Sequence, residues 1–491
     1  MTIRVGCAII IVVQVRGSVK MSTNGTAVKK RFSLGGSRTV DMTKGNIFAH
    51  IIKFSIPLLL GNLFQQLYNM VDTIVIGQAG LNEAYAAVGS VGPIINILIG
   101  FYSGFATGAG VLIAQYFSRK EDENVKKCVH TIVTVTLIMC VIFTVVGILL
   151  TPLLLKLMLG ADSASFAPAR EYLTIYFAGV SGLLLYNIGA GILRAVGDSR
   201  RPFYYLVVAA IMNIVLDVLF VMGLGMGVAG VALATVLSQI TSASLTFITL
   251  IRTDIVVKVS PRSLGIDKEQ LGKIFALGLP AAIQMSITAI ANVFVQGYIA
   301  GADGNQTFNL GGFTTYTKID QILFLPVQSL ALAVSTFVGQ NYGVGNKKRA
   351  RMGAYIALAT SLAIASVLVI IIMIFAPQLA WIFNPDASVV EVATSLLRFI
   401  TPFYLVCSFN QIFSAALRGE GNTFAPMVAM LTCFVGIRQI YLFFTSRFIS
   451  NALVPLVVSY PVGWISCALF ITLYYHLRKD KAAVQKISSE E

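Results

Sequence analysis

Twelve apolar segments follow one another between Gly45 and His476, and each is near or above the length that crosses a bilayer. Inside lipid a backbone must satisfy its own N–H and C=O groups, as a helix does. The composition agrees, because 56% of the residues are hydrophobic and only 12% are charged, whereas soluble domains carry about 25% charged residues. We therefore expect an all-α membrane protein with twelve transmembrane helices.

The chain repeats itself at an offset of 223 to 225 residues. Three pairs of short motifs carry the repeat: SIP with GLP at residues 55–57 and 278–280, AQYF with GQNY at 114–117 and 339–342, and LRAVGDSRRP with LRGEGNTFAP at 193–202 and 417–426. Six helices in each unit give both units the same orientation, as in transporters with parallel repeats around a central cavity. We therefore predict a six-helix N-half over residues 45–251, a cytoplasmic linker loop over 252–273 and a six-helix C-half over 274–477.

The basic residues predict the orientation of the helices. If the N-terminus is placed inside, thirty of the 36 Lys and Arg residues fall in the tails and loops on the inner side. An excess of Lys and Arg marks cytoplasmic loops. These basic loops face the anionic inner leaflet, which accounts for the net charge of +15 without nucleic acid. We expect a multi-pass protein of the cell membrane with both termini in the cytoplasm.

The two ends of the chain are polar. Residues 1–44 contain an apolar run at 7–15 that is too short to span, followed by a basic stretch rich in Ser, Thr and Gly. Composition of this kind predicts a disordered tail, or a spurious one, since Met1, Met21 and Met42 are all possible starts. Residues 478–491 are predicted to form a cytoplasmic tail.

A carboxylate lies in the first apolar segment. Gln65, Tyr68 or Asn69, and Asp72 share one face of a helix, because residues three, four and seven apart stack on one another. A carboxylate in a membrane helix costs about 2.5–3.5 kcal/mol, so its presence indicates a functional site. The alternative is a solvated side chain at the outer interface.

The fifth segment carries a second carboxylate, Asp217, four residues after Asn213 and on the same helical face. Two carboxylates suit a site for Na+, which favours oxygen ligands, or for a proton. A helix-packing hydrogen bond between Asn213 and Asp217 is the alternative. The repeat places Val295 and Tyr441 where Asp72 and Asp217 stand, so the predicted site belongs to the N-half alone.

Other polar residues interrupt the apolar segments and predict a cavity for amphipathic solutes. The candidates are Gln65, Tyr68, Asn69, Tyr176, Asn187, Gln284, Asn292 and Arg438. Some of them are expected to join helices by hydrogen bonds instead. For Arg438 we keep two interpretations, a residue of the substrate path or gate, and a buried partner of a polar neighbour.

The two halves, the opening sequence FSIPLLLGNLFQQLYNMVDTIVIGQ, the LRAVGDSRRP turn and the NIVLD motif resemble the multidrug and toxic compound extrusion (MATE) family, over nearly the whole chain apart from its tails. The resemblance implies a secondary antiporter that expels organic, often cationic, compounds in exchange for Na+ or H+. It is nearest to the branch with a cation site in the N-half. There, carboxylates matching Asp72 and Asp217, an amide matching Asn213 and a hydroxyl matching Thr235 hold the cation, so Na+ is a possible ligand.

Other functions are less well supported by the sequence. A flippase for a lipid-linked precursor is the alternative, but only Arg398 and Arg438 are available inside the membrane to hold a pyrophosphate. No GxxxxGK[ST] motif supports ATP-driven transport, and no DDxxD or HxxxxD motif supports an enzyme. We expect no cofactor beyond the coupling ion, small organic molecules and the lipid bilayer as partners, and a monomer. Gly100, Gly104 and Gly108 predict close helix packing.

Overall fold

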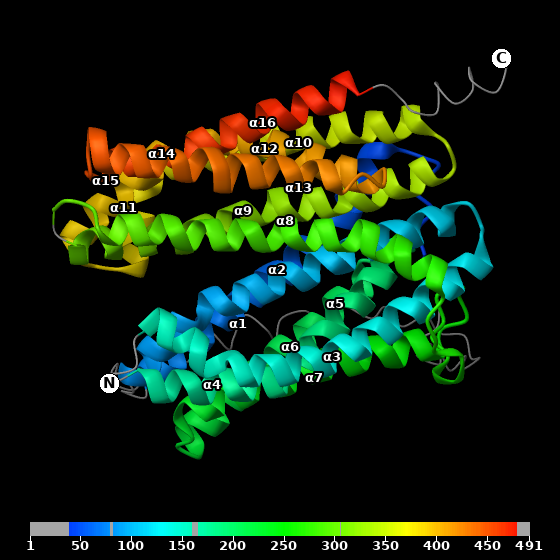
Figure 1. The fold of residues 1–491 in the computed structure, drawn as a ribbon, viewed down its shortest axis with the longest axis horizontal. Coiled ribbons are helices and arrows are strands. Elements are labelled where there is room, and N and C mark those ends of the chain that lie inside the picture. Colours follow the sequence, from blue (N-terminus) through cyan, green and yellow to red (C-terminus); the bar gives the residue numbers. More distant parts are fainter. Residues whose placement is uncertain (1–38, 79–81, 160–164, 305, 479–491) are drawn as a thin grey trace, which may run out of the picture. The chain divides into compact units, whose positions relative to one another are not determined.

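The computed structural model describes residues 39–78, 82–159, 165–304 and 306–478, which form helices joined by loops (Figure 1). The N-half contains α1 (Ile47–Gln78), α2 (Asn82–Ser118), α3 (Asp122–Leu159), α4 (Phe166–Ala178), α5 (Val180–Ala195), α6 (Arg200–Asp217) with a π-helical end (Val218–Gly223), and α7 (Gly227–Arg252).

The C-half contains α8 (Lys268–Ala300), α9 (Gln306–Gly343), α10 (Lys347–Phe383), α11 (Ala387–Ile400) and α12 (Tyr404–Gly419), then α13 (Phe424–Met430), α14 (Arg438–Phe444), α15 (Leu453–Val457) and α16 (Ser459–Leu477). In the described residues, eleven helical segments are long and apolar enough to cross a membrane, and α4 with α5 gives a twelfth. The prediction of an all-α protein with twelve membrane-spanning segments is confirmed.

The fourth segment of each half is broken at the same place in the repeat. In the N-half α4 and α5 meet at Gly179 with a bend of 47°. A Cβ at Gly179 would lie 2.1 Å from Cγ1 of Val236, so only glycine allows α7 to pack this closely against the bend. In the C-half a 3₁₀ turn, Thr401–Phe403, separates α11 from α12. The apolar pattern over residues 168–194 predicted one segment and did not indicate the break.

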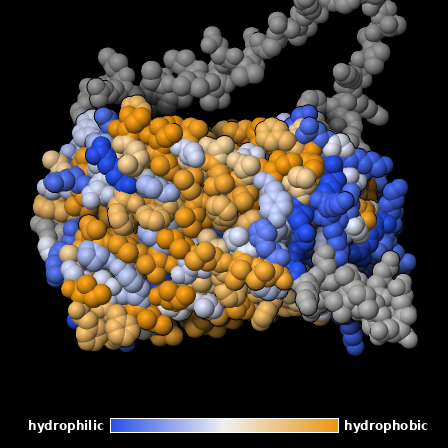
Figure 2. Space-filling model, turned by 90° about the horizontal axis from the view of Figure 1, so that it is seen from above, coloured by the Kyte–Doolittle hydropathy of each residue, from blue (hydrophilic) through white to orange (hydrophobic). Residues whose placement is uncertain are grey.

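The surface carries a broad apolar band with hydrophilic residues at its borders (Figure 2). The helices α3 and α10, which correspond in the repeat, contribute many exposed apolar side chains, among them Val141, Leu149, Leu153, Ile370, Ile374 and Ile382. Water would make such a surface unfavourable and lipid would not. The chain is therefore a multi-pass membrane protein.

The two halves pack along α2 and α8. A Cβ added to Gly104 would lie 2.3 Å from the carbonyl oxygen of Ala281, and one added to Gly108 would lie 2.5 Å from Cα of Gly278. Both distances are far below van der Waals contact, so the backbones of the two helices touch. The prediction of close packing at these glycines is confirmed, and the partner is the other half.

Hydrogen bonds join the halves at the end of the bundle that carries the loops 119–121, 196–199 and 344–346, which we call the basic end. Gln115 donates from Nε2 to the carbonyl of Gly419 (3.0 Å), and Arg119 donates from Nε to the carbonyl of Gly343 (2.7 Å). Gln340 Nε2 on α9 donates to the carbonyl of Ala195 at the end of α5 (3.1 Å). These bonds close the space between the halves at this end.

The segment 40–44 is packed into the basic end, although it belongs to the stretch predicted as a disordered or spurious tail. Met42 is 1% exposed in the core of the C-half. Its amide donates to Oε1 of Gln340 (3.0 Å), and its carbonyl accepts from Asn341 (3.2 Å) and Arg349 (3.2 Å). The tail prediction was wrong for these residues because one apolar side chain and three polar partners hold them. Residues 1–38 lie outside the described part of the chain.

Val40 brings the same segment against the N-half. Gly197 has φ +86, and a Cβ there would lie 2.4 Å from the carbonyl oxygen of Val40, so both backbone conformation and space require glycine.

The linker between the halves is shorter than the predicted loop over 252–273, because α8 begins at Lys268. It is fastened to α3: the amide of Ser260 donates to Nε2 of His130 and that of Asp267 to Oγ1 of Thr131 (both 3.1 Å).

We predict that Gly104→Ala destabilises the protein by about 1–3 kcal/mol, the usual effect of overpacking a close contact. The methyl group would meet backbone of α8, which cannot move aside. Thermal unfolding of the detergent-solubilised protein measures the effect. The control is Gly297→Ala on α8, where an added Cβ meets nothing within 4 Å. Equal unfolding temperatures for the two variants would contradict the packing described here.

Candidate functional site

The face of α1 that carries Asp72 is turned into the N-half bundle. Gly61 lies against Leu206 on α6, and a Cβ at Gly61 would be 3.4 Å from Cδ2 of Leu206. Further along the same face, Tyr68 is 8% exposed and Asp72 is 6% exposed. Burial of the carboxylate argues against the alternative of a solvated side chain at the interface.

Four predicted residues come together where α1, α6 and α7 meet. Asn213 and Asp217 are fully buried, and Thr235 is 5% exposed. The hydroxyl of Thr235 donates to Oδ2 of Asp72 (3.4 Å). The side chains of Asn213 and Asp217 neighbour the same carboxylate. Residues from three helices, up to 163 positions apart in the chain, thus form one polar cluster, which we call the acidic site.

Most oxygens of the acidic site have no hydrogen-bond donor. Oδ1 of Asp72, both carboxylate oxygens of Asp217 and Oδ1 of Asn213 are buried without a partner, as is the amide Nδ2 of Asn213. In the described part of the chain, neither carboxylate forms an ion pair with Lys or Arg. Buried charges that lack a partner are strongly unfavourable. These oxygens could therefore act as ligands of a bound cation, or share a proton between the two carboxylates.

The ligand atoms of the acidic site are compatible with two cations, Na+ and a proton. Two carboxylates, one amide oxygen and one hydroxyl are hard oxygen donors of the kind that bind Na+. Two neighbouring carboxylates can also retain a proton, because they repel each other when both are charged. The described residues contain no group of three His, Cys, Asp or Glu side chains that could hold a metal ion.

Tyrosines from α4 form one wall of the acidic site. The rings of Tyr172 and Tyr176 stack with centroids 6.2 Å apart and planes at 13°. Tyr172 neighbours both Thr235 and Asp72. The hydroxyl of Tyr176 is buried without a partner. Sequence reasoning named Tyr176 and missed Tyr172, although its position four residues earlier on the same helical face was the available signal.

The C-half has no corresponding acidic site at the matching positions. Val295 is fully buried in an apolar cluster, and the hydroxyl of Tyr441 donates to the carbonyl of Pro455 (3.1 Å). The C-half carboxylate Asp320 is provided with donors instead, because it accepts from the hydroxyls of Tyr404 and Tyr316. The two halves thus differ in whether their carboxylates are satisfied.

Arg438 lies inside the C-half with a polar neighbour. It is 1% exposed, and Nη2 donates to Oδ1 of Asn292 on α8 (3.1 Å). Its guanidinium lies over the rings of Phe434 and Tyr460, at 5.4 and 5.2 Å from the centroids, and Cδ packs near Gly463. Of the two interpretations of Arg438, the structure supports the second, a buried side chain that is partnered by a polar neighbour.

The remaining cavity candidates are spread over several environments. Tyr68 and Gln284 are buried, Gln65 and Asn187 are half-buried, and Asn69 and Asn292 are exposed. Asn187 accepts from Ser103 of α2 (3.3 Å), and Gln284 accepts from Arg418 (3.1 Å). At least these two join helices within one half.

Three comparisons with known proteins bear on the family and the fold. The family model MatE matches residues 57–219 and 276–444, one match in each half. The probable multidrug resistance protein YoeA of Bacillus subtilis is 28% identical over 91% of this chain and 98% of its own. The FAD transporter of Shewanella oneidensis is 25% identical over 78% of this chain and 84% of its own.

Solved structures show the same fold. One is described as the outward-facing conformation of a multidrug resistance MATE family transporter of the MOP superfamily. It has a TM-score of 0.82 at 27% sequence identity, and the match covers 92% of this chain and 99% of that chain. A MOP superfamily transporter from Pyrococcus furiosus, whose binding pocket is described as having reverse polarity, has a TM-score of 0.84 at 26% identity and covers 90% and 98%.

We predict that Asp217→Asn raises the stability of the protein by about 1 kcal/mol or more in Na+-free buffer at alkaline pH, where the pair no longer retains a proton, because it removes a buried charge that has no partner. It should also abolish any stabilisation by added Na+. Thermal unfolding with and without Na+ measures both effects. The control Asp320→Asn should instead destabilise, since it disturbs a carboxylate satisfied by two tyrosines. A less stable Asp217→Asn variant that still responds to Na+ would refute the acidic site.

Proposed function

Because the chain belongs to the MatE family of membrane transporters, we propose that it is a secondary active efflux antiporter that exports organic, often cationic, compounds in exchange for Na+ or H+. Members of this family are transporters and not enzymes, and they act on small molecules in the membrane. The observation that carries the proposal is the acidic site in the interior of the N-half, where Oδ1 of Asp72 and both carboxylate oxygens of Asp217 have no hydrogen-bond partner in the protein.

The coupling ion is proposed to bind at Asp72, Asn213, Asp217 and Thr235. An ion or proton there neutralises the two carboxylates, so its presence changes the energy of the N-half bundle. Only a difference in affinity between two arrangements lets a ligand shift their balance. Since α1, α6 and α7 all contribute to the site, a change in their packing alters its affinity, which is the requirement for coupling.

The contacts between the halves support alternating access. Hydrogen bonds join the two halves from the middle of the bundle to the basic end. In the middle, Ser286 on α8 donates to the carbonyl of Ile97 on α2, and Gln115 and Gln340 form their bonds across the halves at the basic end. This pattern is expected when the halves are closed on the basic side. If that side is cytoplasmic, as the basic loops predict, the arrangement opens outward, where substrate leaves and the coupling ion enters.

The proposed location and partners follow from the basic loops and from the family of transporters. We propose that the protein lies in the cell membrane with both termini in the cytoplasm, works as a monomer and uses no ATP. Several relatives are named as multidrug resistance or export proteins, which supports a broad range of organic substrates.

The flippase alternative has less support. Arg398 is exposed on α11. Arg438 is buried inside the C-half and is held by Asn292. Neither arrangement offers the paired guanidinium groups that would hold a pyrophosphate.

We predict that Asp72→Asn and Asp217→Asn each abolish export, because the coupling ion loses a carboxylate, while the protein still reaches the membrane. Efflux of a fluorescent cationic dye from cells, with Na+ and pH gradients imposed separately, measures the effect and identifies the coupling ion. The control is Glu391→Gln, which removes an exposed carboxylate from α11. Full drug resistance and gradient-driven efflux in the Asp72→Asn, Asp217→Asn double variant would contradict the proposal.

We further predict that Gln340→Ala loosens the basic end, because Gln340 bonds both to Met42 and to Ala195 across the halves. The reporter is a cysteine placed at Thr336 in an otherwise cysteine-free protein. In inverted vesicles, this cysteine should react with an impermeant thiol reagent several times faster when Gln340→Ala is present than when Gln340 is retained. The matched control is Gln439→Ala, which removes hydrogen bonds confined to the C-half. An unchanged labelling rate would show that Gln340 does not hold this end closed.

A further inference from the structure

The segment 40–44 crosses from one half to the other at the basic end, and we call it the strap. It precedes α1, the first helix of the N-half, yet its residue Met42 is buried in the core of the C-half. On the other side, the carbonyl oxygen of Val40 lies against Gly197 of the N-half, where an added Cβ would be 2.4 Å from it. The strap therefore contacts both halves at the end where they are joined.

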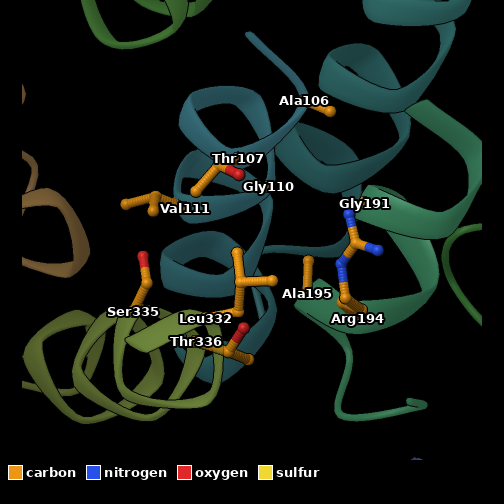
Figure 3. Close-up of a pocket in the computed structure, with 10 residues that line it drawn as sticks. All are labelled: Ala106, Thr107, Gly110, Val111, Gly191, Arg194, Ala195, Leu332, Ser335 and Thr336. Atoms are coloured by element: carbon orange, nitrogen blue, oxygen red, sulfur yellow. The ribbon is translucent and has the colours of Figure 1, made fainter. Parts of the chain in front are cut away.

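Gln340 connects the strap to the contact between the halves. Its Oε1 accepts from the amide of Met42 (3.0 Å), while its Nε2 donates to the carbonyl of Ala195 at the end of α5 (3.1 Å). One turn earlier on α9, Thr336 lines a pocket that lies between α9 of the C-half and α2 and α5 of the N-half (Figure 3). The side-chain amide of Gln340 is thus held by the strap on one side and by the N-half on the other, beside the place where the halves meet.

The repeat shows what the strap adds to this contact. Gln115 on α2 corresponds to Gln340 on α9. It donates from Nε2 to the carbonyl of Gly419 (3.0 Å), and Gly419 corresponds to Ala195. Each half thus has one glutamine that bonds to the end of the fourth segment of the other half. The counterpart of the strap in the repeat is the end of the linker, which is bonded to α3 instead. In the described residues, the strap is hydrogen-bonded to one of the two glutamines, and the linker to neither.

The strap is joined to α1 by a fixed turn and not by slack chain. Gly45 has φ +79, and Nε2 of His50 on α1 donates to the carbonyl of Lys44 (2.8 Å). The same carbonyl accepts from Nη2 of Arg349 on α10 (2.9 Å). A movement of α1 away from α10 must therefore break the bond to Arg349 and withdraw Met42 from the core of the C-half.

We propose that the strap is a lock that holds the basic end closed and sets how readily the two halves separate there. Because its contacts involve both halves, they are lost when the halves part, and contacts made in one arrangement stabilise that arrangement over the other. The movement that opens the pocket between the halves must also free Gln340 from the strap. This inference rests on the proposed alternating access, and it adds the element that limits opening on the side of the basic loops.

The distance between two spin labels tests the proposal in the purified, otherwise cysteine-free protein. The labels are attached to cysteines that replace Lys126 on α3 and Val344 after α9, both exposed at the basic end. Met42→Ser removes the apolar anchor of the strap, so the population with a longer distance should rise several-fold over the parent protein. A short glycine insertion after Gly45 should have the same effect, because it gives the strap slack while Met42 stays buried. The control Met352→Ser, at a methionine 53% exposed on α10, should leave the distances unchanged.

The insertion variant keeps the test decisive. If Met42→Ser does not yield folded protein, the insertion decides, because it leaves every side chain of the core in place. An unchanged distance distribution in a folded variant of either kind would overturn the proposal, as would an equal change in Met352→Ser. The measurement needs no transport, so this failure would leave the efflux antiporter standing. Export that is independent of Asp72 and Asp217 would instead contradict the antiporter and leave the strap in place.

Discussion

The buried pair of carboxylates in the N-half is the constraint on which the account depends. Asp72 and Asp217 lie side by side in the interior of a membrane bundle, and most of their oxygens have no donor. Ionised groups in this position are unfavourable unless a cation or a proton joins them. The packing of α1, α6 and α7 around the pair therefore cannot be independent of what is bound, and this links ion binding to the arrangement of the helices.

The rest of the structure makes this dependence one-sided. In the C-half, Asp320 accepts from two tyrosines and Arg438 is held by Asn292 and two aromatic rings. The carboxylate of Asp320 therefore has hydrogen-bond donors within the bundle, unlike the carboxylates of the N-half pair. The C-half offers a stable body against which the N-half packs through the glycines of α2, and to which the segment around Met42 is fixed. The two halves thus share a fold, but only the N-half carries the acidic site.

The sequence predicted the features that arise from hydrophobic length, repetition and helical spacing. The number of membrane-spanning segments, the offset of the repeat and the common face of Asn213 and Asp217 all follow from such patterns. Features that depend on tertiary contacts were missed. Nothing local distinguishes Met42 from a residue of a polar tail, and Arg194 and Arg418 occur in the same motif. The hydrogen bond from Arg418 to Gln284, 134 residues away, depends on tertiary packing that this motif does not reveal.

The most direct measurement of the central claim is equilibrium binding of a cationic dye to the purified protein as the concentration of Na+ or H+ is varied, together with the reverse titration. If the acidic site couples the two ligands, each weakens the binding of the other by the same factor, because coupling free energies are reciprocal. This mutual effect should vanish when both Asp72 and Asp217 are replaced by Asn. Dye and cation that bind independently in the wild type, or an effect that survives the double replacement, would contradict the account.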